Sequence, residues 1–315
     1  MRKLKIVFMG TPEFAVTTLD TINKSEHEVV GVITAPDRPA GRGRKLNESA
    51  VKQYAVANNL PILQPTNLKN ETFLAELEAL NANLQIVVAF RMLPKVVWQM
   101  PEYGTFNVHA SLLPNYRGAA PINWAIINGE AKTGVTTFFI DDKIDTGEII
   151  LQNEITIDSD DTAGILHDKL MVLGASLALK TADLISMGKV NTTKQVFEGD
   201  MKSAYKIFKK TCKIDWDKPI NEIYNHIRGL SPYPTANTTL INNDEIIFLK
   251  IYKVSIIKES HNYEIGKLLA TKKELKIAVN SGFVILEEIQ LPGKKRMAVA
   301  ALLNGLKFSE NAKVR

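Results

Sequence analysis

The stretch FNVHASLLPNYRG (residues 106–118) joins a short apolar strand to a polar turn. Side chains alternate across a strand, so Asn107 and His109 project from the same face and arrive together where the strand ends. Pro114 stops the chain from continuing as a strand soon afterwards. Open α/β sheets bind their ligands at the carboxyl ends of their strands. The stretch therefore predicts the functional edge of such a sheet, with Asn107 and His109 on it.

The segments on both sides of this stretch alternate between strand-like and helix-like patterns. Short apolar runs rich in β-branched and aromatic residues predict strands, and segments with helical periodicity lie between them. The strands are expected at 4–9, 29–34, 84–90, 105–109 and 134–140, and the helices at 13–24, 48–59, 71–81 and 121–128. Near-continuous apolar strands separated by helices indicate a doubly wound α/β domain, Rossmann-like, with a mainly parallel sheet covered on both faces.

The second half of the chain has a different texture. A two-stranded excursion is expected at 148–157, followed by a helix over 161–187 with Asp161 or Thr162 at its start and Gly188 at its end. Short alternating runs then predict strands at 235–240, 246–255, 265–270, 275–279 and 283–290, with one short helix at 220–228. Such spacing is typical of a small β-barrel that resembles the oligonucleotide-binding (OB) fold. We expect a first domain over 1–189, a linker over 190–205 and a second domain over 206–315.

Composition excludes several classes of protein. The 315 residues are 45% hydrophobic and 23% charged, which is close to globular averages and argues against a largely disordered chain. The sequence has no run of roughly 18–20 apolar residues that could cross a membrane, and its single cysteine, Cys212, cannot form an internal disulfide. We therefore expect a soluble cytoplasmic protein. The five histidines are scattered and no metal-binding motif occurs, so we expect no metal.

Charge is distributed unevenly along the chain. Residues 1–205 contain 20 Lys and Arg against 23 Asp and Glu, whereas residues 206–315 contain 19 against 11, so the net charges are −3 and +8. Clustered cations release the counterions that are condensed on a nucleic-acid backbone, and this release favours binding. The excess is also compatible with a lysine-rich, well-solvated surface. Charge alone leaves both interpretations open.

A second polar segment, FFIDDKIDTGEII (residues 138–150), follows the strand expected at 134–140. Its three carboxylates, Asp141, Asp142 and Asp145, precede a Thr-Gly turn. Asp residues commonly stabilise turns through their own backbone, and this explains one or two of them. If the strand neighbours the one that carries His109, one aspartate can reach the imidazole. The residues alone do not determine which.

Such an Asn, His and Asp group lacks a nucleophile of its own. Ser111 and Cys212 are the candidates, but Ser111 lies beyond the expected strand end and Cys212 falls in the second domain. A substrate amine that attacks a carbonyl carbon fits better. The amide N–H of Asn107 and a protonated His109 would then stabilise the oxyanion, while the aspartate holds the imidazolium and assists proton transfer.

The segment TAPDRPAGRGRKL (residues 34–46) predicts a mobile basic loop on the same rim of the sheet. It contains Arg38, Arg42, Arg44 and Lys45. Arginine guanidinium groups match phosphates and base edges geometrically, so the loop is a candidate RNA contact. A solvated surface loop is the alternative.

With these segments described, the sequence resembles the folate-dependent formyltransferases. FNVHASLLPNYRGAAPINWAIINGE and IDDKIDTGEIILQ are similar to the paired signatures of that family. PDRPAGRGRKL is similar to the loop of the members that act on methionyl-tRNA, and KIDWDKPINEIYNHIRGLSPYPTA and QLPGKKRMAVAALLNG resemble the C-terminal domain of those members. The likeness spans nearly the whole chain.

The resemblance implies transfer of a formyl group from 10-formyltetrahydrofolate to the α-amino group of initiator methionyl-tRNA, by direct amine attack and without a metal. The product would serve translation initiation. In this family Asn107, His109 and Asp145 match the catalytic residues, and Arg42 falls in the loop that enters the acceptor stem. Domain 1–189 would be catalytic and domain 206–315 would bind tRNA, in a protein that we expect to be monomeric. The folate-binding residues expected are Ser111, Leu112, Leu113, Pro114, Arg91, Met92, Leu93 and Asp142. The tRNA-binding residues expected are Arg38, Arg42, Arg44, Lys45, Lys209, Lys294 and Lys295.

One departure and two alternatives accompany this interpretation. Many members of the family have a glycine where this chain has Arg91, and the segment should flank the pterin pocket. A formyltransferase that acts on a small amine, such as glycinamide ribonucleotide or an amino sugar nucleotide, would resemble the chain around Asn107 but would not require the 34–46 loop or a basic second domain. A non-catalytic RNA-binding protein is disfavoured because Asn107, His109 and Asp145 are all present.

Overall fold

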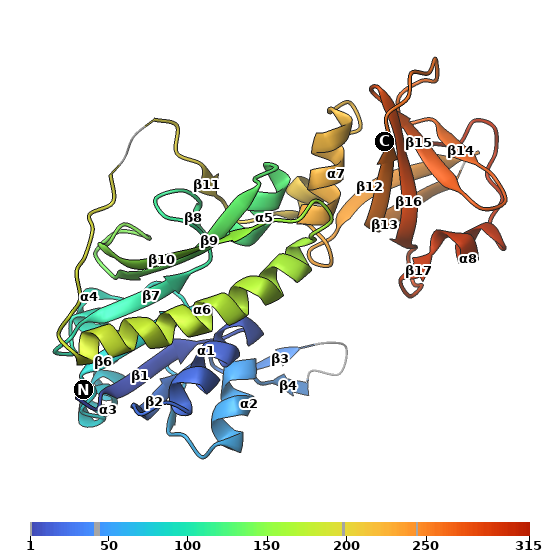
Figure 1. The fold of residues 1–315 in the computed structure, drawn as a ribbon. Coiled ribbons are helices and arrows are strands. Elements are labelled where there is room, and N and C mark those ends of the chain that lie inside the picture. The colour runs from blue at the N-terminus through green and yellow to red at the C-terminus, as the bar shows by residue number, and fades with distance from the viewer. Residues whose placement is uncertain (1, 41–44, 197–198, 244) are drawn as a thin grey trace. The chain divides into compact units, whose positions relative to one another are not determined.

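The computed structural model describes residues 2–40, 45–196, 199–243 and 245–315. It divides into two compact units, shown in Figure 1. Unit 1 comprises residues 1–118, 133–155 and 167–203, and unit 2 comprises residues 119–132, 156–166 and 204–315. The units are therefore not continuous in sequence, and the expected division at 190–205 stays a prediction. No helix in the described ranges is both long and apolar enough to cross a membrane.

Unit 1 is built on one sheet whose strands follow the order β10-β9-β7-β6-β1-β2-β5. Its strands are β1 (Lys5–Gly10), β2 (Glu28–Ile33), β5 (Ile62–Leu63), β6 (Leu84–Val88), β7 (Thr105–His109), β9 (Lys132–Phe139) and β10 (Ile149–Thr156). The pairs β1 with β2, β1 with β6, β6 with β7 and β2 with β5 are parallel. The mainly parallel sheet predicted from the sequence is confirmed, and the bounds of β7 are those expected.

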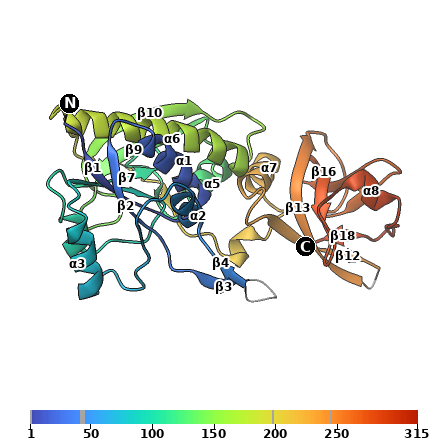
Figure 2. The ribbon, with the colours of Figure 1, turned by 90° about the horizontal axis from the view of Figure 1, so that it is seen from below.

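Helices cover both faces of this sheet. They are α1 (Glu13–Asn23), α2 (Ala50–Ala57), α3 (Glu71–Ala79), α4 (Lys95–Trp98) and α6 (Ala163–Ser186). Figure 2 shows α6 on one side of the strands and α3 on the other. Residues of α3 and α4 pack with Val7, Met9 and Val87 in one buried cluster, whereas Gly174 of α6 lies against Val108 and Val135. The doubly wound arrangement follows from strands that are apolar on both faces.

Helix ends agree with the residues at them. Ser49 and Asn70 cap α2 and α3 by accepting the backbone N–H of Lys52 and Phe73. The Thr162 hydroxyl accepts the N–H of Ile165 at the start of α6, and Gly188 follows that helix with a φ of +65°. Thr162 and Gly188 were among the predicted end signals of this helix. Asn70 shows the general preference for a short polar side chain at the N-cap of a helix.

One feature of the sheet was not predicted from the sequence, and one prediction about it was wrong. The strand expected at 134–140 is antiparallel to β7, because Phe106 pairs with Phe139 and His109 with Thr136. The connection over 110–131, with α5 (Pro121–Ile127), does not cross the sheet, since residues 119–132 cluster with unit 2. The chain therefore re-enters the sheet at the edge where β7 ends. The segment at 148–157 is not a separate two-stranded excursion, because it forms the single edge strand β10 beside β9.

Unit 2 contains a nearly closed antiparallel barrel in the strand order β14-β15-β16-β13-β12-β18. The strands are β12 (Ala236–Asn242), β13 (Glu245–Ile257), β14 (Leu268–Ala270), β15 (Leu275–Val279), β16 (Gly282–Gln290), β17 (Met297–Ala298) and β18 (Lys313–Val314). Leu268 N–H donates to Ala312 O and Val314 N–H to Gly266 O, both at 2.9 Å, so β18 reaches the chain that leads into β14. The helices are α7 (Ile220–Gly229) and α8 (Val299–Leu303), with a 3₁₀ turn at Lys209–Cys212. The predicted barrel is confirmed.

Short elements complete the chain. They are β3 (Arg38–Ala40), β4 (Lys45–Asn47), β8 (Arg117–Gly118) and β11 (Ser203–Ala204). β3 and β4 form an antiparallel hairpin where the sequence suggested only a loop. Residues 41–44, between β3 and β4 in the sequence, lie outside the described residues.

Candidate active site at the end of β7

Asn107 and His109 share one face of β7 at the carboxyl edge of the sheet. Asn107 lies opposite Val87 of β6 and Phe138 of β9, and His109 is the last residue of the strand. Val87 belongs to the buried cluster under α3 and α4, so the two polar side chains emerge on that side. The sequence prediction that they arrive together at a strand end is confirmed by this register.

The imidazole of His109 is buried and has a polar neighbour at each nitrogen. Nε2 lies 2.9 Å from the carbonyl oxygen of Tyr116, and Nδ1 lies 3.9 Å from Oδ2 of Asp145. A carbonyl oxygen can only accept, so Nε2 donates and carries a proton. The distance from Nδ1 to Asp145 is too long for a hydrogen bond. Both atoms can still contact one third atom at hydrogen-bond distances of about 2.8 Å.

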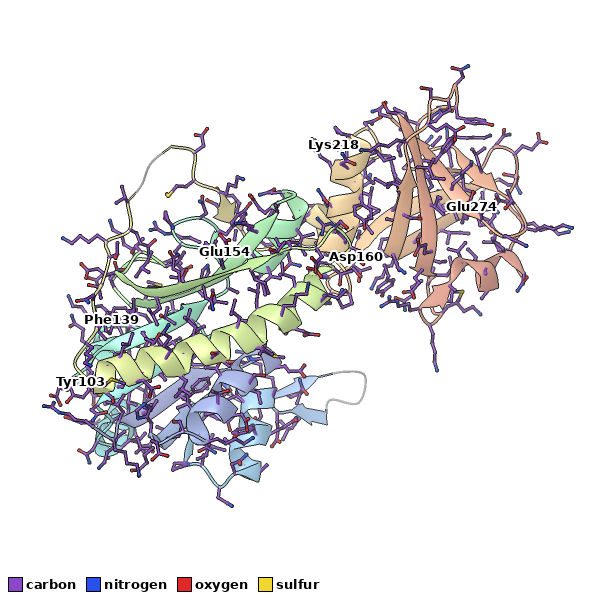
Figure 3. All side chains as sticks on the ribbon, viewed as in Figure 1. Tyr103, Phe139, Glu154, Asp160, Lys218 and Glu274 are labelled. Carbon is purple, nitrogen blue, oxygen red and sulfur yellow. The ribbon has the colours of Figure 1, made fainter. Side chains whose placement is uncertain are left out.

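Asp145 reaches His109 by a route that the antiparallel direction of β9 makes longer than expected. β9 ends at Phe139, opposite Phe106, and Figure 3 shows Phe139 and Tyr103 at that same end of the sheet. His109 is three residues farther along β7, which is about 10 Å at the usual rise of a strand. The loop after β9 must therefore run back along the sheet before Asp145 lies beside His109.

The side chain of Asp145 is held by the backbone of the neighbouring turn. Its Oδ2 accepts the N–H of Gly118 at 2.9 Å, and the side chain is only 12% exposed. The residue itself has a φ of +54°, in the left-handed region that Asp and Asn tolerate better than most side chains. The carboxylate is thus fixed in orientation while its charge faces Nδ1 of His109.

The amide of Asn107 has hydrogen-bonding capacity that a substrate could use. Its Oδ1 is buried and has no hydrogen-bond partner among the residues that the structure describes. An unsatisfied buried acceptor costs roughly 1–3 kcal/mol, so such a group is expected to meet a partner in the working state of the protein. The neighbourhood of Nδ1 and Oδ2 makes a polar substrate group the natural partner.

The other two aspartates of the loop have different surroundings. Asp141 Oδ1 accepts the backbone N–H of Lys143 at 2.9 Å and the hydroxyl of Thr146 at 2.6 Å, so it stabilises the turn as the sequence suggested. Asp142 is exposed and lies 3.8 Å from Lys95 Nζ. Of the three carboxylates, Asp145 is the one beside His109.

The turn after β7 is fixed by bonds to β9 and β10. Ser111 is buried, its hydroxyl donates to Asn115 O at 2.7 Å, and its carbonyl accepts the hydroxyl of Thr136. The Leu113 N–H donates to that same Thr136 hydroxyl, and the Leu113 carbonyl accepts from Gln152. Leu113 is buried, and Leu112 and Pro114 are half-buried. These four residues form a rigid turn beside His109.

The segment after β6 lies partly exposed. Leu93 is buried in the cluster under α3 and α4, whereas Met92 is 67% exposed. The guanidinium of Arg91 donates to Thr66 O at 2.9 Å and to Pro65 O. Burial lowers the pKa of Arg91, and the nearby charge of Arg38 lowers it further. Arg91 therefore ties its own loop to the chain at 65–66.

Residues 4–181 match the family described as formyl transferase, and residues 206–307 match its C-terminal domain family. The chain belongs to the formyl transferase family. A protein of Flavobacterium johnsoniae named methionyl-tRNA formyltransferase is 65% identical over the whole of both chains. A protein of the same name from Bacteroides thetaiotaomicron is 51% identical over 99% of this chain and 98% of its own.

Solved formyl transferase structures share the fold. A sugar 3N-formyl transferase, WlaRD, described in the presence of dTDP and 5-N-formyl-THF, is 26% identical. The comparison covers 94% of this chain and all of that one, with a TM-score of 0.64. Glycinamide ribonucleotide transformylase 1 from Symbiobacterium toebii is 18% identical over 59% of this chain, with a TM-score of 0.50, and shows likeness of fold alone.

In this formyl transferase the basic residues expected at RNA are spread over both units. Arg38 is exposed on β3, and Lys209, Lys294 and Lys295 are exposed in unit 2. Lys45 opens β4. Arg42 and Arg44 lie outside the described residues. Over the same described ranges, no cluster of three or more His, Cys, Asp or Glu side chains has a geometry that could hold a metal ion.

Sequence reasoning missed several residues that organise this formyl transferase site. They are Tyr116, Arg117, Gly118, Thr136, Gln152 and Gln195. Tyr116 and Gly118 act through backbone groups, which no side-chain pattern reveals. Gln195 lies 50 residues from Asp145 in sequence, in a segment without periodicity. Gln195 also lines a cavity of about 430 Å³ with Asp141, Thr146 and Gly147.

Proposed function

We propose that this chain transfers the formyl group of 10-formyltetrahydrofolate to the α-amino group of methionyl-tRNA. Full-length relatives at 65% and 51% identity carry the name methionyl-tRNA formyltransferase, and both family domains are present. A folate donor is supported by the family and by the sugar formyl transferase described with 5-N-formyl-THF. The net charge of +8 over residues 206–315 supports a polyanionic acceptor.

One observation carries the chemistry. The buried Oδ1 of Asn107, which has no hydrogen-bond partner in the described part of the chain, lies on the same strand face as the His109 imidazole, whose Nδ1 is 3.9 Å from the Asp145 carboxylate. Two further facts favour a nucleophile from the substrate. The Ser111 hydroxyl is buried and donates to Asn115 O. The thiol of Cys212 is buried in unit 2, where burial raises its pKa. Neither side chain is suited to attack a formyl carbon.

The reaction begins when the neutral amine of methionyl-tRNA attacks the formyl carbon with its lone pair. The carbonyl π electrons move to the formyl oxygen, which becomes an oxyanion. The side-chain N–H of Asn107 donates to that oxyanion, and its Oδ1 accepts an N–H of the attacking amine. One preorganised donor of this kind is typically worth about 2.7–4 kcal/mol in the transition state.

Collapse of the tetrahedral intermediate requires one proton to leave the attacking nitrogen and one to reach the leaving nitrogen. Nδ1 of His109 is the acceptor that we assign, since Nε2 already donates to Tyr116 O. Asp145 stabilises the resulting imidazolium across 3.9 Å. The oxyanion then re-forms the carbonyl as the C–N10 bond breaks. N10 takes the electron pair of that bond and the proton from Nδ1 of His109, and tetrahydrofolate leaves. The proton count balances without a metal or an oxidant.

The folate and tRNA contacts complete the proposal. The rigid turn of Ser111, Leu112, Leu113 and Pro114, together with the segment Arg91-Met92-Leu93 and Asp142, lies on the donor side. Arg38, Arg42, Arg44 and Lys45 contact the acceptor stem. Lys209, Lys294 and Lys295 contact phosphates elsewhere on the tRNA.

A formylation assay tests the proposal directly. The purified chain is incubated with 10-formyltetrahydrofolate and with methionyl-tRNA, uncharged tRNA or glycinamide ribonucleotide in separate reactions. We expect formylmethionyl-tRNA in the first reaction and no formyl product in the other two. Activity on glycinamide ribonucleotide alone would replace this proposal with a small-amine acceptor. Absence of any transfer would reject the catalytic assignment of Asn107, His109 and Asp145.

A further inference from the structure

Gln195 uses its whole amide to bridge two loops of the site. It follows α6 in unit 1 and is 9% exposed. Its Nε2 donates to the carbonyl of Asp145 at 3.0 Å and to that of Gly147 at 2.8 Å, and its Oε1 accepts from Nη2 of Arg117. Both the Nε2 and the Oε1 of the amide are therefore engaged by the two loops.

The backbone before Gln195 is anchored to the edge of the sheet. Thr193 and Ile149 exchange two N–H to carbonyl bonds of 2.8 Å each, so the chain adds one strand residue beside β10. The hydroxyl of Thr192 donates to the Glu148 carboxylate in an exposed contact, on which these two backbone bonds do not depend. Gln195 thus projects from a backbone whose position is set by the sheet.

The loop that Gln195 holds needs support from outside itself. Asp145 has a φ of +54°, a conformation that costs an ordinary residue roughly 1–2 kcal/mol. Gly147 is pressed so closely against β9 that an added Cβ would lie 1.6 Å from Phe139 O. The two bonds from Nε2 fall on these two residues, one on each side of Thr146. They fix the backbone that carries the Asp145 carboxylate.

The third bond reaches Arg117, the neighbour of the residue that binds that carboxylate. Arg117 immediately precedes Gly118, whose N–H holds Asp145 Oδ2 at 2.9 Å. Burial lowers the pKa of Arg117, while the charges of Asp145 and Asp141 oppose that shift. One side chain is therefore bonded both to the residue that bears the carboxylate and to the neighbour of the N–H that orients it.

We propose that Gln195 is a positioning residue for Asp145. It sets the distance and direction of the carboxylate relative to His109 by holding the 145–147 backbone and Arg117 in one frame. It acts through the protein groups that it bonds, Asp145, Gly147 and Arg117. The catalytic part of this inference rests on the proposed function, whereas the positioning part concerns the loop alone.

The test compares Gln195→Met with wild type and with Thr192→Val. Methionine has nearly the same length and volume but makes none of the three bonds. Thr192→Val removes the hydroxyl bond to Glu148 from the same segment and leaves Gln195 in place. Two measurements are made on each full-length protein: hydrogen exchange of the amides at 141–148, and kcat and KM for both substrates well below the melting temperature.

We expect faster exchange at 141–148 in Gln195→Met and a kcat reduced about 10- to 100-fold, the size of effect that displacement of a catalytic group produces. The KM for the folate donor should stay within about twofold, because a misplaced carboxylate affects the transition state more than the ground state. Thr192→Val should match wild type in kcat. A loss caused only by instability would instead lower the melting temperature of Gln195→Met and leave kcat per folded molecule unchanged.

The two proposals fail in different ways. If Gln195→Met shows wild-type exchange at 141–148 and wild-type kcat, Gln195 is not a positioning residue. If wild type transfers no formyl group to any acceptor, the proposed function fails, and exchange at 141–148 still decides whether Gln195 holds the loop. Faster exchange with an unchanged kcat would overturn the catalytic part of the inference.

Discussion

Replacing Asp145 by Asn isolates the charge of the carboxylate from its shape. Asn tolerates a φ of +54° and keeps an oxygen that can accept the N–H of Gly118, so the loop should retain its conformation. What is lost is the attraction between the carboxylate and an imidazolium whose Nδ1 lies 3.9 Å away. At an effective dielectric constant of about 20, two unit charges at that distance attract by about 4 kcal/mol.

That energy sets the expected size of the effect. A tenfold change in rate corresponds to about 1.36 kcal/mol, so full loss of the attraction would lower kcat by about 10³-fold. Asn retains part of the interaction through its amide dipole, so we expect a reduction between about 10²- and 10³-fold. The assay is single-turnover formylation of methionyl-tRNA with saturating donor, which measures the chemical step without product release.

A second histidine and aspartate pair in unit 1 provides the matched control. His27 Nε2 lies 3.1 Å from Asp183 Oδ1, and His27 is buried, but the pair lies on other elements and contacts none of the site residues described above. Asp183→Asn should leave the single-turnover rate within about twofold of wild type while lowering the melting temperature. A rate for Asp145→Asn within tenfold of wild type, with normal folding, would refute the electrostatic role of Asp145.

Three other outcomes are expected. Asn107→Ala should lower kcat by about 10²- to 10³-fold with little change in the melting temperature, measured by the same formylation assay, because it removes one oxyanion donor. Burial lowers the pKa of His226, so the unfolded chain binds a proton more readily than the folded one. The free energy of unfolding of unit 2 should therefore fall as the pH drops below about 6.5. Chemical denaturation at pH 7.5 and 5.5 measures this change, and His226→Asn should lose less stability over that interval. Changing Lys294 and Lys295 together to Ala should make the salt dependence of tRNA affinity less steep by about one to two units in a plot of log K against log salt, and an unchanged slope would remove both residues from the contact.

The sequence predicted most of what depends on local patterns. β7 was expected at Thr105–His109 and lies there, and the shared face of Asn107 and His109 followed from the alternation of side chains. The direction of β9 could not be obtained in this way. Its apolar pattern is the same for either direction, and the direction is set by whether residues 110–131 cross the sheet. That depends on where α5 packs, which is a tertiary property.

The candidate site likewise has residues that the sequence could identify and residues that only the structure shows. Asp145 was one of three aspartates until the family resemblance distinguished it. In the structure it is the one beside His109, while Asp141 stabilises a turn. The supports of the site act across long sequence separations, as Gln195 does on Asp145, or through main-chain groups, as Gly118 and Tyr116 do. These contacts leave no periodic signal, so no reading of single residues could have found them.

The two histidine and aspartate pairs of unit 1 show what the supports achieve. His27 and Asp183 are free to approach to 3.1 Å and form a direct bond, which suits a structural pair. His109 and Asp145 stay 3.9 Å apart, because Tyr116 O holds Nε2 and Gly118 N–H holds Oδ2. A direct hydrogen bond would require a proton on Nδ1, because an ionised carboxylate only accepts, and that proton would occupy the lone pair of Nδ1. Keeping the pair slightly open leaves that lone pair available to a proton from a substrate while the carboxylate remains close enough to stabilise the cation that forms.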